Sequence, residues 1–135
     1  MPHAERIVAV LSEYGVPHEL HIASAHKNPE RVIALVDGYN QRKDAVCYIT
    51  IAGRSNALSA VVAARAVHPV IACPPFKDKA DYLVNIHSSL QSPSRVPVLT
   101  VVDPSNAARA AVRILALGEQ ALREKVESDI ASLRA

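Results

Sequence analysis

The chain has 135 residues, a length that suits one domain with a proper hydrophobic core. Its 15 basic and 13 acidic residues give a net charge of +2, which is too balanced for a nucleic-acid-binding footprint, and the near absence of aromatic residues (4%, no Trp) removes the platforms on which single strands stack. Half of the residues are apolar, so we expect a layered α/β core of Ala, Val, Ile and Leu.

Helices are expected where apolar residues recur with helical spacing, and strands where short β-branched runs are bounded by Gly, Pro or polar residues. Capping signals support three helix ends: Gly15 after the first helix, and the pairs Asn28-Pro29 and Asp103-Pro104 before two later ones. In chain order, the predicted elements are a helix over 3–14, a strand over 18–23, a helix over 29–39, a strand over 46–52, a helix over 57–67, a strand over 69–73, a helix over 81–90, a strand over 96–102, and helices over 105–117 and 119–133.

This alternation of helices and strands predicts a single three-layer α/β/α domain with a parallel sheet. One feature departs from the pattern, because the first predicted element is the helix over 3–14. In a doubly wound sheet each helix returns from a strand. We therefore expect this helix to follow a strand that the sequence does not contain.

Two cysteines, Cys47 and Cys73, each lie in an apolar run that is typical of a buried strand. They form no CxxC pair, which indicates two free thiols in a reducing compartment. The longest apolar runs are far shorter than a membrane span, and the first residues carry no apolar signal region. The sequence therefore predicts a cytoplasmic protein.

Residues 46–58 connect the central strand to the next helix through a polar turn. The strand over 46–52 is apolar on both faces except at Thr50, as expected between two helix layers. The turn over 53–56 follows at the carboxyl end, where α/β proteins place their binding sites. Backbone N–H groups at a helix start, with Arg54 as a clamp, could bind an anion. An ordinary turn with Asn56 as an N-cap is the equally weighted alternative.

His26 is the best candidate for acid–base chemistry. It lies directly after the predicted strand over 18–23, and an imidazole suits proton transfer near neutral pH. Lys27 beside it could bind a carboxylate or a phosphate. The plainer interpretation is a surface histidine hydrated by water. No histidine pair has the spacing of metal ligands, and Ser88-Ser89 is a weak candidate for a further polar wall. The residues alone indicate a site for a small anionic metabolite.

Four segments of the sequence, in the right order and across essentially the whole chain, resemble the PurE family. They are Ser24-Ala25-His26-Lys27, the run from Ile49 to Leu58, Ile71-Ala72-Cys73-Pro74-Pro75 and Ser88-Ser89-Leu90. The chain is similar more narrowly to class II, the phosphoribosylaminoimidazole (AIR) carboxylases. Class I mutases carry a glycine- and histidine-bearing loop where this chain has Arg54, Ser55 and Asn56.

The resemblance implies a flavodoxin-like fold, assembly into an octamer and a role in purine biosynthesis. It implies carboxylation of 5-aminoimidazole ribonucleotide with CO2 to 4-carboxy-5-aminoimidazole ribonucleotide, with no cofactor: no ATP, biotin or metal. Carried onto this sequence, His26 moves the proton on and off the ring carbon, and Lys27 is the second catalytic residue. The implied substrate-binding residues are Ser24, Ala25, Ala52, Gly53, Arg54, Ser55 and Leu58.

The sequence departs from the family at its start. Members open with a buried strand that ends in Gly-Ser-x-Ser-Asp, so the resemblance predicts a PurE-like domain over 1–135 that is truncated at its N-terminus, with the usual first strand absent beside 46–52. Three readings stay open. The first is a complete enzyme whose start was assigned too late or whose sequence was shortened. The second is a non-catalytic nucleotide-binding or assembly member. The third is N-carboxyaminoimidazole ribonucleotide mutase activity.

Overall fold

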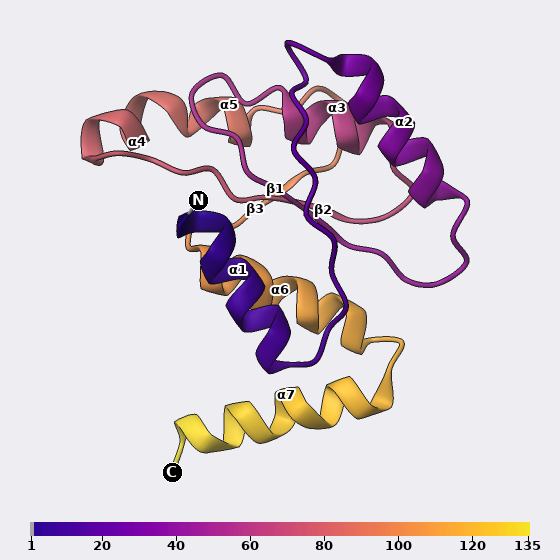
Figure 1. Cartoon of the computed structure of the whole chain (residues 1–135). Helices are drawn as coiled ribbons and strands as arrows, with labels where there is room; N and C mark the ends of the chain where they lie inside the picture. Colours follow the sequence, from indigo (N-terminus) through magenta and orange to yellow (C-terminus); the bar gives the residue numbers. More distant parts are fainter. Residues whose placement is uncertain (1) are drawn as a thin grey trace.

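Helices cover both faces of a short parallel sheet in the computed structural model, which describes residues 2–135 (Figure 1). Within these residues the sheet has the strand order β1-β2-β3, and both neighbouring pairs are parallel. The three strands are β1 (Tyr48–Thr50), β2 (Val70–Ala72) and β3 (Leu99–Thr100). Each crossover between them contains helix, as parallel pairing requires, and the expected α/β class is confirmed.

Seven helices lie in the described part of the chain. They are α1 (Pro2–Glu13), α2 (Pro29–Asn40), α3 (Leu58–Arg65), α4 (Lys79–Asn85), α5 (His87–Leu90), α6 (Pro104–Ala116) and α7 (Gln120–Leu133). In Figure 1, α1 and α6 lie on one side of the sheet, α2 and α3 on the other, and α7 beyond α6. None of the helices in residues 2–135 combines the length and the apolar content needed to cross a bilayer.

The core is built around the central strand β2. Its residues Val70, Ile71 and Ala72 are at most 2% exposed, because a strand paired on both edges is covered by a helix layer on each face. Ile71 belongs to the cluster under α1 and α6, and Val70 to the cluster under α2 and α3. The alanines of α6 that face this core are fully or almost fully buried, and their small size lets α1 pack closely against α6. They are Ala107, Ala108 and Ala111.

The capping signals of the sequence are confirmed. The Asn28 side chain accepts a hydrogen bond from the Arg31 N–H at 3.1 Å, and Asp103 accepts one from the Asn106 N–H at 2.9 Å. Gly15 has a φ of +67°, the left-handed conformation that commonly ends a helix and that costs glycine little.

The predicted strand over 18–23 is wrong. These residues form no ladder with any described strand, and the side chains of Leu20 and Ile22 are 64% and 82% exposed. A strand exists only where a neighbour offers N–H and C=O groups in register. The bonds from Tyr48 N–H to Pro69 O and from Cys73 N–H to Thr50 O direct alternate backbone groups of β1 towards β2. The intervening groups of β1 face an edge that is unpaired within residues 2–135.

The other strands and one helix also differ from their predicted limits. The strands predicted over 46–52 and 96–102 are three and two residues long, because each strand is limited to the residues that pair with β2. The helix predicted over 81–90 is two helices, α4 and α5, which meet at Ile86. Apolar runs therefore located β1, β2 and β3 correctly but overestimated their lengths.

The burial of Ile71 allows a direct test of the core. We expect Ile71→Ala to lower the free energy of unfolding by about 2–5 kcal/mol, since it removes buried methyl and methylene groups and leaves a cavity. Val67→Ala is the control, because the Val67 side chain is 73% exposed, and it should cost less than about 0.5 kcal/mol. Chemical denaturation measures both values, and equal losses in the two variants would contradict this core.

Candidate functional site

A cavity of about 240 Å³ lies between the loop before α2 and the turn after β1. The structure brings the two loops together, and seven of the nine predicted site residues line this cavity: Ser24, Ala25, His26, Ala52, Gly53, Ser55 and Leu58. The remaining two differ. Arg54 lines a neighbouring cavity, and Lys27 lines neither of the two.

The loop that carries His26 is a tight turn held by Ser24. The Ser24 hydroxyl accepts a hydrogen bond from the Lys27 N–H at 3.2 Å, and the Ser24 carbonyl accepts one from the Asn28 N–H at 2.9 Å. These bonds set the turn against the capped start of α2. The His26 side chain is exposed and makes no hydrogen bond to any other residue in 2–135, so both ring nitrogens are available to a ligand in the cavity.

The turn over 53–56 is held in a particular shape at two points. A Cβ atom added at Gly53 would lie 3.1 Å from the Pro75 carbonyl oxygen, so a larger residue would press this turn against the loop after β2. Arg54 has a φ of +50°, a left-handed conformation that is uncommon for residues other than glycine. The turn therefore depends on its surroundings for its conformation.

A second cavity of about 290 Å³ lies on the other side of Gly53. Arg54 and Lys77 bring positive charge to its wall, beside the apolar rings of Pro75 and Phe76. The remaining wall residue is Asp81, whose pKa lies below its ordinary value because its carboxylate accepts a hydrogen bond from the Lys77 N–H. Sequence reasoning missed Phe76 and Lys77. The end of a strand before Pro74-Pro75 was the available signal, because neighbouring parallel strands end at the same edge.

Asn56, Ser88 and Ser89 join the turn to α5. Asn56 Oδ1 accepts a hydrogen bond from the Ser59 N–H at 3.2 Å, which serves the start of α3 in the way expected of an N-cap side chain. Its Nδ2 donates to Ser89 Oγ at 2.9 Å, and both side chains are buried. Ser88 Oγ donates to the Arg54 carbonyl at 2.6 Å. Neither serine lines either cavity, so the predicted polar wall is a support behind the turn.

A second polar cluster lies at the carboxyl end of β2. His3 Nε2 is 3.2 Å from the Cys73 carbonyl oxygen and 3.3 Å from Cys73 Sγ. Burial lowers the pKa of His3 and raises the pKa of the fully buried Cys73 thiol to about 11, so both groups are neutral near pH 7. A neutral, inaccessible thiol is a poor nucleophile. The contacts of His3 instead join the start of α1 to Cys73 at the end of β2, beside the Arg6–Asp103 ion pair at 3.0 Å.

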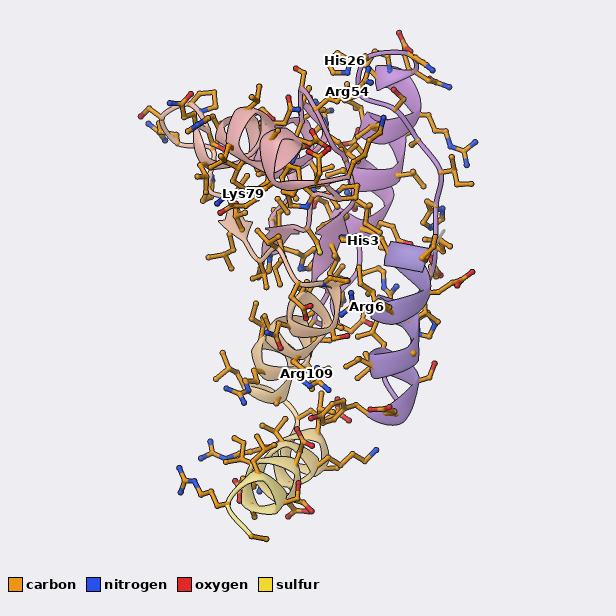
Figure 2. The ribbon with its side chains drawn as sticks, turned by 90° about the vertical axis from the view of Figure 1, so that its left-hand side faces the viewer. His3, Arg6, His26, Arg54, Lys79 and Arg109 are labelled. Atoms are coloured by element: carbon orange, nitrogen blue, oxygen red, sulfur yellow. The ribbon has the colours of Figure 1, made fainter. Side chains whose placement is uncertain are left out.

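The charged side chains are spread along the molecule. Figure 2 shows His26 and Arg54 at one end, His3 and Arg6 near the middle, and Arg109 further towards the opposite end. Within residues 2–135, no group of three or more His, Cys, Asp or Glu side chains is arranged to hold a metal ion. The chemistry that this arrangement offers is proton transfer by an imidazole that shares its cavity with hydroxyl and backbone amide groups, with a guanidinium in the neighbouring cavity.

The Asn56 side chain is buried and makes two hydrogen bonds, so we expect it to contribute to the free energy of unfolding. We expect Asn56→Ala to lower the free energy of unfolding by about 1–3 kcal/mol, since it leaves the Ser59 N–H and the Ser89 hydroxyl without their partner. Asn106→Ala is the control, because the Asn106 side chain is exposed on α6 and makes no hydrogen bond within residues 2–135. Thermal or urea unfolding compares the two. A loss for Asn106→Ala as large as that for Asn56→Ala would contradict this role.

Comparison with known proteins gives one consistent assignment. The family described as AIR carboxylase matches residues 1–135. The chain is 41% identical to a phosphoribosylaminoimidazole carboxylase of Archaeoglobus fulgidus, over 93% of this chain and 68% of that protein. It is 42% identical to an N5-carboxyaminoimidazole ribonucleotide mutase of Methanocaldococcus jannaschii, over 91% of this chain and 76% of that protein. The crystal structure of Treponema denticola PurE superposes with a TM-score of 0.91 at 39% identity, covering 99% of this chain and 84% of that one. The chain therefore belongs to the AIR carboxylase (PurE) family and has its flavodoxin-like α/β fold.

Proposed function

We propose that this chain carboxylates 5-aminoimidazole ribonucleotide with CO2 to give 4-carboxy-5-aminoimidazole ribonucleotide. The observation that carries the proposal is the shared cavity, in which the free imidazole of His26 faces the turn over 53–55. The carboxylases of class II, which this chain resembles at Gly53-Arg54-Ser55-Asn56, provide the substrate class. The identity of 41% to a named phosphoribosylaminoimidazole carboxylase supports the same choice.

In the proposed reaction the electron pair of the ring carbon forms a bond to the carbon of CO2. The C–H bond of that ring carbon then breaks, its electrons restore the aromatic ring, and the proton passes to the imidazole of His26. The product carries the new carboxylate, and His26 later releases its proton to water. No electron acceptor or additional reactant is needed, so one group that accepts and returns a proton is sufficient.

The polar groups around the cavity suit an anionic nucleotide. The exposed ammonium of Lys27, next to His26 in the chain, can stabilise the phosphate or the developing carboxylate. The backbone of Gly53 and the hydroxyl groups of Ser24 and Ser55 are hydrogen-bonding groups for the substrate. We assign Arg54, which lines the neighbouring cavity, to the part of the nucleotide that would extend past the turn.

We also propose that the chain acts as a homo-oligomer, with the octamer of the family as the expected state. Exposed apolar side chains are compatible with such an assembly, among them Leu83 and Val84 on α4 and Leu117 after α6. The free thiols Cys47 and Cys73 are compatible with the cytoplasm as the place of action.

Replacement of His26 tests the proton-transfer role. We expect His26→Asn to lower the rate of carboxylation by a factor of about 10² or more, the usual contribution of a positioned general base. His87→Asn is the control, since its side chain is also exposed but lies on α5 and lines neither cavity. Incorporation of labelled CO2 into the nucleotide measures both variants. A rate for His26→Asn within a few-fold of the unsubstituted chain would contradict the assignment.

The named mutase among the relatives favours one alternative, conversion of the N-carboxylated nucleotide to the same product. A carboxylase requires dissolved CO2 and accepts 5-aminoimidazole ribonucleotide, whereas a mutase uses the N-carboxylated nucleotide at a rate independent of added CO2. We expect product formation to rise with CO2 concentration until saturation, as followed by ultraviolet absorbance. Turnover of the N-carboxylated substrate alone would establish the mutase. Binding of nucleotide without turnover of either substrate would indicate the non-catalytic member.

A further inference from the structure

We propose that Ser88 is a positioning residue, which fixes the turn over 54–56 through one hydroxyl group and thereby sets the walls of both cavities. The inference rests on the proposed function, because it assigns to this turn the binding of the nucleotide. Ser88 lies on α5, outside both cavities, so it acts through the turn and not by contact with substrate.

The Ser88 hydroxyl contacts two backbone groups on either side of Ser55. It donates to the Arg54 carbonyl at 2.6 Å and accepts from the Asn56 N–H at 3.0 Å. The Asn85 carbonyl is a second possible acceptor at 3.0 Å. A hydroxyl has one proton to donate, and the shorter distance favours Arg54. One side chain therefore closes a ring that includes the backbone of Arg54, Ser55 and Asn56.

This ring fixes the direction of the Arg54 carbonyl, in the turn where Arg54 has a φ of +50°. A residue other than glycine stays in this region only where its surroundings determine the conformation. Of the Arg54 backbone groups, the carbonyl is bound by Ser88. The carbonyl of the next residue, Ser55, accepts from the Ala57 N–H at 3.0 Å, which continues the turn into α3.

The support behind Ser88 is itself attached to the sheet. The neighbouring Ser89 is 2% exposed, and its hydroxyl accepts from Asn56 Nδ2 at 2.9 Å. Its carbonyl accepts from the Thr100 hydroxyl of β3 at 3.3 Å. Hydrogen bonds through α5 thus connect the turn that follows β1 to β3, the strand on the far side of β2. Within this supported turn, Arg54 lines one cavity and Ser55 lines the other.

The test compares Ser88→Ala, which removes the hydroxyl, with Ser88→Thr, which keeps it. Ser94→Ala is the control, because Ser94 is exposed in the following turn and makes no hydrogen bond within residues 2–135. Two readouts are measured on each full chain: the steady-state kcat, KM and pH profile with 5-aminoimidazole ribonucleotide, and the backbone hydrogen exchange of residues 54–57.

In Ser88→Ala we expect the Asn56 N–H to exchange faster by a factor on the order of 10, since it loses its acceptor. We expect the KM to rise at least about five-fold while the pH profile of kcat stays unchanged, because His26 lies on the other loop. Ser88→Thr should restore both values towards those of the unsubstituted chain.

Two results would overturn the proposal. One is unchanged hydrogen exchange at 54–57 in Ser88→Ala, which would show that the hydroxyl does not hold the turn. The other is a lower kcat at an unchanged KM, which is the result expected if Ser88 only stabilises the fold. If the unsubstituted chain catalyses no carboxylation, the proposed function fails, and the exchange measurement alone decides whether Ser88 holds the turn.

Discussion

Parallel pairing of β1 with β2 is the constraint on which the rest of this structure depends. Parallel strands end at the same edge, so the turn after β1 and the loop after β2 must meet there, and Gly53 packs against the Pro75 carbonyl. The same pairing buries Ile71 on one face and Val70 on the other, which places a helix layer against each. The cavity with His26 exists because α2 and α3 cover that second face and bring their amino ends together.

The site combines free and fixed groups in a way that suits its proposed chemistry. His26 is exposed and makes no hydrogen bond to another side chain or backbone group within residues 2–135, so its ring nitrogens are accessible to a proton donor or acceptor. The opposing turn is held by two buried hydrogen bonds of the Asn56 side chain, which accepts one from the Ser59 N–H and donates the other to the Ser89 hydroxyl. Preorganised polar groups of this kind stabilise developing charge without having to rearrange during the reaction. The residue proposed to transfer the proton therefore lies on the loop before α2, whereas the hydrogen-bonded turn opposite it follows β1.

Two cavities share the wall at Gly53, and they differ in character. The one beside His26 is lined by small residues and hydroxyl groups, whereas the other carries Arg54 and Lys77 beside apolar rings. A ligand that spans the turn would contact His26 on one side, and Arg54, Lys77 and Asp81 on the other. Arg54, whose backbone is left-handed, lines the second cavity and not the first.

The sequence by itself determined the fold class, the place of most helices and of three strands, and seven of the residues that line the cavity with His26. Helical periodicity, the caps at Asn28 and Asp103, and polar turns at strand ends are local signals, and the segments that carry them lie where those signals placed them. Only the tertiary structure decided the strand lengths, the absence of a ladder at 18–23 and the support of the turn by Ser88. The reason is physical: strand pairing and long-range hydrogen bonds require partners far apart in the chain, and their register is set only when the helices pack against the sheet.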